Sequence, residues 1–177
     1  MRRTKALIDV GGQPMATHVA HALTAAGCRD VVIVGGDPTE LASLNLPVIA
    51  DRHPGEGPVG GVLTALHHHH AATHVVVAAC DIPGLTARAV KRMLAAATIA
   101  TDVVVAMTDQ LEPVLAVWNV RTTAPLEAAF DAGTRAMHQA LALFDVVTVS
   151  VDPSEMRNIN RPEDLLRGTL RDDGGGQ

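Results

Sequence analysis

The stretch HVVVAACDIP, residues 74–83, decides the fold of this chain. Its first half is a nearly continuous apolar, valine-rich run, which is typical of a strand covered on both faces by helices. A lone carboxylate, Asp81, follows the run, and Pro83 prevents the strand from continuing. In α/β proteins, ligands bind beyond the carboxyl ends of the strands, so Asp81 is predicted to lie at a binding site.

The sequence on either side alternates strand-like and helix-like segments, as βα units do. Strands are predicted at 30–34, 46–50, 74–79, 102–106, 114–118 and 146–151, and helices at 14–26, 38–44, 62–72, 86–97, 125–131, 134–143 and 162–167. This order predicts an α/β protein with helices layered on a buried sheet. Residues 1–171 are expected to form a single domain, and the polar, Gly-rich residues 172–177 a disordered tail.

Composition excludes several classes of function. The 177 residues carry a net charge of −5 and only 2% aromatic residues. That balance argues against a nucleic-acid partner, since both a phosphate-backbone footprint and a stacking platform are missing. No segment approaches the length of a transmembrane helix, so no membrane association is expected. The two cysteines, Cys28 and Cys80, lie beside apolar sequence and are interpreted as reduced core residues of a cytoplasmic protein.

Two carboxylates follow predicted strands. Asp81 is either a Mg²⁺ ligand at a strand end or the cap of the turn before Pro83. Asp51 opens the loop DRHPGEGPVGG, residues 51–61, whose glycines allow close approach of a ligand to the backbone. The alternative for this segment is a mobile surface loop, but so many glycines and prolines between a strand and a helix favour a binding loop.

Other polar residues are ambiguous on their own. Lys5 by itself would be a solvated charge. Asn158 and Asn160 either contact a ligand or cap the helix predicted at Pro162. Arg135 either meets a phosphate or pairs with a neighbouring acid, Asp131.

A run of histidines at residues 67–70, followed by His74, invites a metal-site interpretation. Consecutive residues on a helix point around its circumference and cannot all reach one ion. The run also lacks a carboxylate with the spacing of a recognisable metal site. We therefore assign no function to it from the sequence.

Six segments, taken in order, resemble the molybdenum cofactor guanylyltransferase (MobA) family over nearly the whole chain. They are TKALIDVGGQPM (4–15), DRHPGEGPVGG (51–61), ACDIPGLT (79–86), EPVLAVW (112–118), AGTRAM (132–137) and RNINRPEDL (157–165). Each segment alone is a weak signal, but six in the right order are a strong one.

The resemblance implies a Rossmann-like, three-layer α/β/α nucleotidyltransferase fold with a mostly parallel sheet. It also implies transfer of GMP from GTP to molybdenum-bound molybdopterin, with Mg²⁺ and release of pyrophosphate. Lys5 matches the family lysine that contacts the triphosphate, Asp51 an acidic residue of the nucleotide pocket, and Asp81 the metal-binding aspartate. Asn158 and Asn160 match the NxN motif near the acceptor. Molybdoenzymes or their chaperones are further candidate partners.

The chain departs from the family at its start. Members open with a strand and a signature of the form LAGGxSxRMGxDK, and Met1 falls at the signature's Met, with Arg2 in place of its Gly and Thr4 in place of its Asp. We therefore expect an upstream extension of about 15–20 residues, the length of one strand and its loop. Without that loop the chain is expected to be a poor enzyme.

Two other functions remain open from the sequence. One is a cytidylyltransferase, or another sugar or cofactor nucleotidyltransferase, of the same fold. The other is a non-catalytic homologue that binds a nucleotide or a protein. The segment GPVGG at 57–61 resembles the guanylyl branch and ranks the first alternative behind guanylyl transfer.

Overall fold

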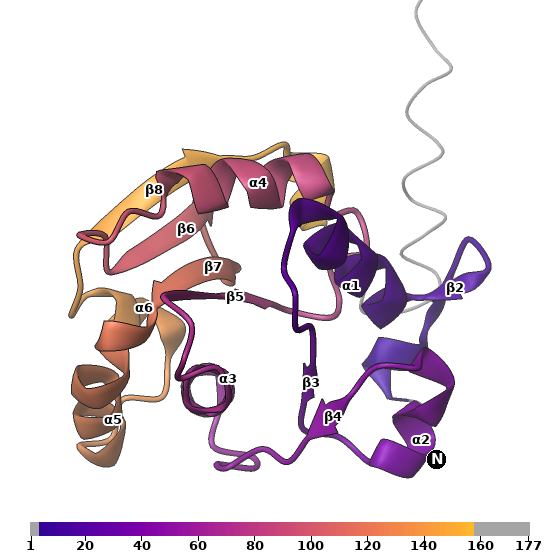
Figure 1. The fold of residues 1–177 in the computed structure, drawn as a ribbon, viewed down its shortest axis with the longest axis horizontal. Coiled ribbons are helices and arrows are strands. Elements are labelled where there is room, and N and C mark those ends of the chain that lie inside the picture. Colours follow the sequence, from indigo (N-terminus) through magenta and orange to yellow (C-terminus); the bar gives the residue numbers. More distant parts are fainter. Residues whose placement is uncertain (1–3, 158–177) are drawn as a thin grey trace, which may run out of the picture.

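A computed structural model describes residues 4–157, which form helical layers on both faces of a mixed β-sheet (Figure 1). The three-layer α/β/α architecture predicted from the sequence is confirmed. The helix predicted at 162–167, the two asparagines at 158 and 160, and the predicted tail lie outside the described residues.

The main sheet has four strands in the order β5-β7-β6-β8. These are β5 (His74–Ala78), β7 (Leu111–Asn119), β6 (Val103–Met107) and β8 (Val146–Ser150). Strand β7 is antiparallel to both β5 and β6, whereas β6 and β8 are parallel. Three strands therefore share one direction and β7 runs against them. The prediction at 114–118 missed the first three residues of β7, which are polar or partly exposed and so lack a buried-strand pattern.

The helices cover the sheet in two groups. Helices α1 (Met15–Ala26) and α4 (Ala87–Ala96) pack on one face of the sheet, where they contact Val104, Ala106 and Leu115. Helices α3 (Pro58–His68), α5 (Thr123–Asp131) and α6 (Met137–Leu141) pack on the other, around the fully buried Trp118. Val103 to Ala106 in β6 are all buried, as expected for a strand with a helix layer on each side.

Local signals set most helix boundaries. Helix α1 ends at Gly27, whose φ of 105° suits a residue without Cβ. Thr86 caps α4 by accepting a hydrogen bond from the Ala89 N–H, as predicted. The predicted start of α3 at residue 62 was wrong, since the helix begins at Pro58. Proline is favoured in the first helical turn because its missing N–H would have no partner there.

The remaining elements form a smaller unit. Strands β3 (Ile33–Val34) and β4 (Val48–Ile49) pair in parallel, and β1 (Asp9–Val10) and β2 (Gln13–Pro14) form an antiparallel hairpin. Helix α2 spans Pro38–Leu41. Short 3-10 turns complete the described chain at Lys5–Leu7, Ala42–Leu44, Val120–Thr122 and Pro153–Met156.

A groove separates β3 from β5, so the sheet is divided. Its walls are formed by residues 31–34 and 76–79, most of them valine or alanine. Within residues 4–157, no strand pairs with the edge of β5 that faces away from β7, or with the edge of β3 that faces away from β4. The strands predicted at 30–34 and 46–50 shrink to two residues each, because only those residues find a ladder partner.

Among the described residues, no helix combines the length and the apolar character that crossing a bilayer requires.

Candidate active site

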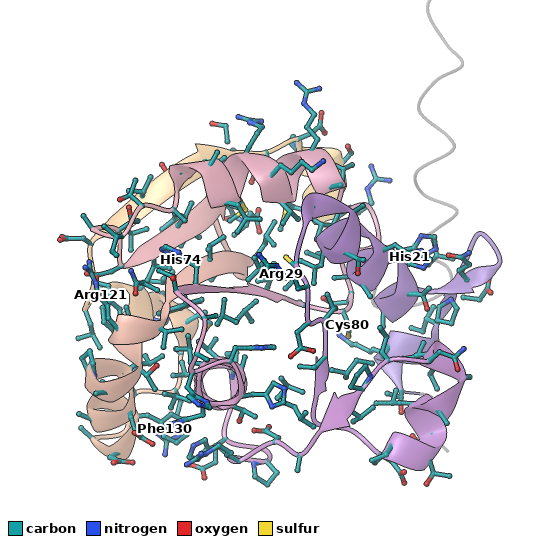
Figure 2. All side chains as sticks on the ribbon, in the orientation of Figure 1. His21, Arg29, His74, Cys80, Arg121 and Phe130 are labelled. Atoms are coloured by element: carbon teal, nitrogen blue, oxygen red, sulfur yellow. The ribbon has the colours of Figure 1, made fainter. Side chains whose placement is uncertain are left out.

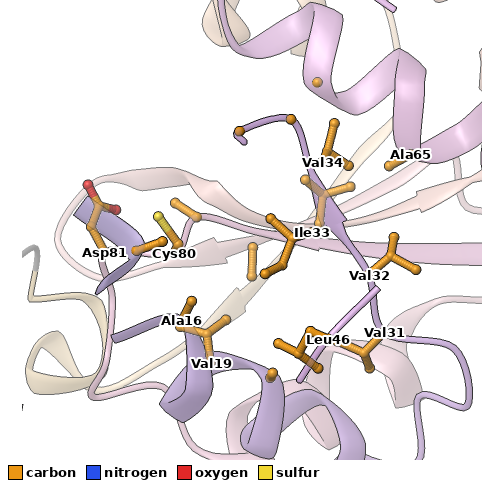
Figure 3. A pocket seen from close by; sticks show the side chains of 18 of the residues that line it. Ala16, Val19, Val31, Val32, Ile33, Val34, Leu46, Ala65, Cys80 and Asp81 are labelled. Carbon is orange, nitrogen blue, oxygen red and sulfur yellow. The ribbon is translucent and has the colours of Figure 1, made fainter. Parts of the chain in front are cut away.

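A pocket of about 500 Å³ brings the predicted site residues together. Lys5, Asp51 and Asp81 all line it, although they come from distant parts of the sequence. Figure 3 shows Asp81 and Cys80 at one end of the pocket, with Val31 and Val32 toward the other. The volume falls within the range of cofactor-sized sites.

Asp81 and Lys5 meet across 76 positions of sequence. The Lys5 Nζ lies 3.5 Å from the Asp81 Oδ2. Asp81 follows the end of β5, and the next residue, Ile82, is fully buried and fixes this turn against the core. Lys5 opens a short 3-10 turn that is anchored by buried Ala6. The Asp81 side chain is 13% exposed and that of Lys5 53%, so the pair contributes little to stability and its charges remain available to a ligand.

Asp51 is held in a fixed orientation after β4. Its Oδ1 accepts hydrogen bonds of 3.0 Å from the His53 N–H and from the Thr64 hydroxyl. Thr64 is buried, and its oxygen also accepts from the Arg52 N–H. Sequence reasoning missed Thr64, because a threonine inside a helix carries no signal that it contacts a carboxylate in a preceding loop.

The loop after Asp51 is docked to the helical layer. Glu56 accepts a hydrogen bond of 2.7 Å from Arg135, whose guanidinium lies 3.6 Å from the centre of the Phe130 ring. The His53 ring also packs on Phe130, with a centroid separation of 4.5 Å. The sequence left Arg135 between a phosphate and Asp131; in the structure it pairs with Glu56 rather than with Asp131. These contacts tie the loop, at His53 and Glu56, to Phe130 and Arg135.

Cys80 lies between the strand and Asp81, and its position suggests no nucleophilic role. Burial, followed by the neighbouring charge of Asp81, raises the pKa of the Cys80 thiol. The thiol therefore stays protonated at neutral pH, and only the thiolate is nucleophilic. Burial also raises the pKa of Cys28, and neither cysteine forms a disulfide.

The geometry defines the class of protein. A Rossmann-like α/β fold presents a carboxylate beyond the end of β5 and an ammonium group from the first 3-10 turn, over a pocket large enough for a nucleotide. Such an arrangement suits phosphate-bearing ligands, because the ammonium offsets phosphate charge and carboxylate oxygen is a ligand for hard cations.

The chain belongs to the MobA-like NTP transferase domain family, which it matches over residues 1–155. It is therefore a nucleotidyltransferase. A molybdenum cofactor guanylyltransferase from Cereibacter sphaeroides is 32% identical over 166 residues, covering 92% of this chain and 85% of the relative. The corresponding protein of Xanthomonas euvesicatoria pv. vesicatoria is 31% identical over 172 residues, covering 94% and 86%.

Solved structures agree with this assignment. Molybdopterin-guanine dinucleotide biosynthesis protein A from Archaeoglobus fulgidus is 26% identical, with a TM-score of 0.73, and the match covers 94% of this chain and 90% of that one. 4-Diphosphocytidyl-2C-methyl-D-erythritol synthase from Anaerococcus prevotii has a TM-score of 0.75 at 12% identity, covering 92% and 90%. The second likeness shows the fold alone.

Proposed function

We propose that this protein transfers GMP from GTP to molybdenum-bound molybdopterin, releasing pyrophosphate. One observation carries the proposal. Lys5 and Asp81 are far apart in the sequence but meet in one pocket, in a chain that belongs to the MobA-like family. The names of the relatives from C. sphaeroides and X. euvesicatoria support guanylyl transfer as the particular reaction.

A divalent metal ion suits the donors that this pocket offers, and we propose Mg²⁺. Mg²⁺ prefers oxygen ligands, keeps several waters, and is usually bound by one or two carboxylates together with substrate phosphates. Asp81 would hold the ion, and Asp51 supplies a second carboxylate in the wall of the same pocket. When bound, the ion would neutralise charge on the triphosphate.

The chain's own residues act mainly by positioning and by charge. A terminal phosphate oxygen of the acceptor forms a bond to the α-phosphorus of GTP, and the bond from that phosphorus to the bridging oxygen breaks as pyrophosphate leaves. The Lys5 ammonium would offset the charge that collects on the leaving group. No strong base is needed, because the attacking oxygen is already ionised. Asp51, oriented by Thr64, would contact the nucleotide.

The acceptor side remains a prediction. Asn158 and Asn160, the residues assigned to molybdopterin, lie outside the described residues. A cytoplasmic location and contacts with molybdoenzymes or their chaperones also remain predictions.

The base preference can be tested by thermal stability. We expect 5 mM GTP, with Mg²⁺, to raise the Tm of the protein more than equal concentrations of CTP or ATP, because only a ligand that favours the native state stabilises it. A larger shift with CTP would favour the cytidylyltransferase alternative. Equal shifts for all three nucleotides would indicate a phosphate site without base selection and would contradict guanylyl transfer.

Lys5→Gln should separate a role in phosphate binding from a role in folding. We expect turnover to fall about 10–100-fold, since one charge that faces the triphosphate is lost. The Tm should change little, because the Lys5 side chain is 53% exposed. Lys91→Gln, on the exposed side of α4, is the matched control. A large fall in Tm that accompanies the loss of activity would assign Lys5 a structural role instead.

A further inference from the structure

The histidine run lies where α3 ends, not within a continuous helix. Helix α3 stops at His68, and His69 has φ −97° and ψ 30°, outside the helical region. The side chains of His68 and His69 therefore do not diverge as they would on a regular helix. Their rings meet edge to face, with centroids 4.7 Å apart. The four histidines still do not all meet, as the sequence argument expected, but His68 and His69 approach one point.

A carboxylate from another element joins these two rings. Asp30 lies in the segment that leads from α1 to β3. Its Oδ2 is 3.5 Å from the His69 Nδ1 and 3.8 Å from the His68 Nε2. One donor atom from each of the three residues lies within 4.8 Å of the other two. The carboxylate that the histidine run lacks in sequence is therefore supplied by the fold.

We propose that Asp30, His68 and His69 form a binding site for a transition-metal ion, with Zn²⁺ as the best-matched species. Imidazole nitrogen and carboxylate oxygen are its usual ligands, at about 2.0–2.2 Å, which places neighbouring donor atoms about 3.4 Å apart. Side chains that are 17–63% exposed can close the remaining distance by rotamer adjustment. Three protein ligands leave the fourth tetrahedral position to water.

The charge state of the cluster also suits a cation. Burial, and then the nearby His68 ring, lower the pKa of His69, while Asp30 opposes this effect. A lower pKa favours the neutral imidazole, which is the form that binds a metal ion.

The other histidines of the region have different partners. His67 Nε2 lies 3.0 Å from Glu127 Oε1, and His70 Nδ1 lies 3.1 Å from the His67 carbonyl oxygen. His74 Nε2 lies 3.1 Å from the Thr98 carbonyl oxygen. These histidines are close in sequence to His68 and His69 but do not contact Asp30, so their variants are controls for Zn²⁺ binding.

The site lies away from the nucleotide pocket. Asp30 precedes β3 and His69 precedes β5, whereas Asp81 follows β5. His74 and Cys80 mark the two ends of this strand region in Figure 2. A bound ion would join the chain segments that enter the two walls of the groove, so its role is to fix their spacing rather than to take part in phosphoryl transfer.

Untagged protein, freed of metal by dialysis against EDTA, would be titrated with ZnCl₂ by calorimetry. We expect one site with a Kd on the order of micromolar and a rise in Tm at saturation. Asp30→Asn, His68→Gln and His69→Gln should each weaken Zn²⁺ binding by about 10-fold or more. His67→Gln and His70→Gln should retain wild-type affinity, and the double variant at His68 and His69 should retain nucleotidyl transfer.

Two outcomes would overturn the site. One is that the double variant at His68 and His69 binds one Zn²⁺ with wild-type affinity. The other is that the His67 and His70 control variants lose as much Zn²⁺ affinity as the variants of the cluster. If the partly buried His69 variant fails to fold, the exposed Asp30→Asn variant decides the question. Because Zn²⁺ affinity is measured without GTP, this test is independent of the proposed enzymatic activity.

Discussion

Asp81→Asn is expected to reduce nucleotidyl transfer by about 10²–10³-fold, the usual cost of removing one group that stabilises developing charge. Asparagine keeps the size and hydrogen-bonding shape of the side chain but removes the charge that a hard cation requires. Pyrophosphate release from GTP and molybdenum-bound molybdopterin, measured over a range of Mg²⁺ concentrations, would test this. Excess Mg²⁺ should not restore wild-type turnover.

The fold should survive this substitution. Asp81 faces a partly exposed Lys5 at 3.5 Å, an interaction that contributes less than about 1 kcal/mol. The Tm should therefore change by less than about 2–4 °C. Asp109→Asn, in the exposed turn between β6 and β7, is the matched control and should leave turnover unchanged. Normal turnover in the Asp81 variant would remove this residue from the site.

The second large effect is expected from filling the groove between β3 and β5. Its walls are apolar, and the two flanking strands each lack a ladder partner on that side within residues 4–157. Unpaired strand edges are a stability cost and an aggregation hazard. A designed N-terminal extension of about 15–20 residues, with an apolar strand followed by a Gly-Gly turn and an Arg or Ser, would offer the groove a pairing strand and a phosphate-binding loop.

We expect the extended chain to have a Tm about 4–8 °C higher, equivalent to about 2 kcal/mol for a domain of this size. The gain comes from burying valines of the groove, each worth about 1.5–3 kcal/mol when fully covered. The extended chain should also show a larger GTP-induced shift in Tm. An extension of equal length made of Gly and Ser is the control, since it cannot pair as a strand with an apolar face.

Hydrogen exchange would locate the effect. Amides of residues 31–34 and 76–79 should exchange more slowly in the extended chain than in the Gly/Ser control. Equal exchange and equal Tm in the two chains would show that the groove does not accept a strand. Efficient GTP turnover by the 177-residue chain would show that turnover does not require the added strand and loop.

Local elements, and the polar residues at their ends, could be predicted from the amino-acid sequence. An apolar run predicts β5 wherever it lies in the fold, and a carboxylate directly after it must lie at a strand end. Pro14 and Gly27 bracket α1, and Thr86 starts α4, because caps act through residues a few positions away. Short-range signals of this kind predict that Asp51 and Asp81 follow strands, and both residues line the pocket.

Contacts between residues far apart in the sequence could not be predicted in this way. The contact of Lys5 with Asp81 depends on how the first 3-10 turn packs against the end of β5. The antiparallel course of β7, the pairing of Arg135 with Glu56, and the approach of Asp30 to His68 and His69 likewise depend on long-range packing. Side-chain periodicity records which face of an element is buried, but it does not record the partner against which that face packs.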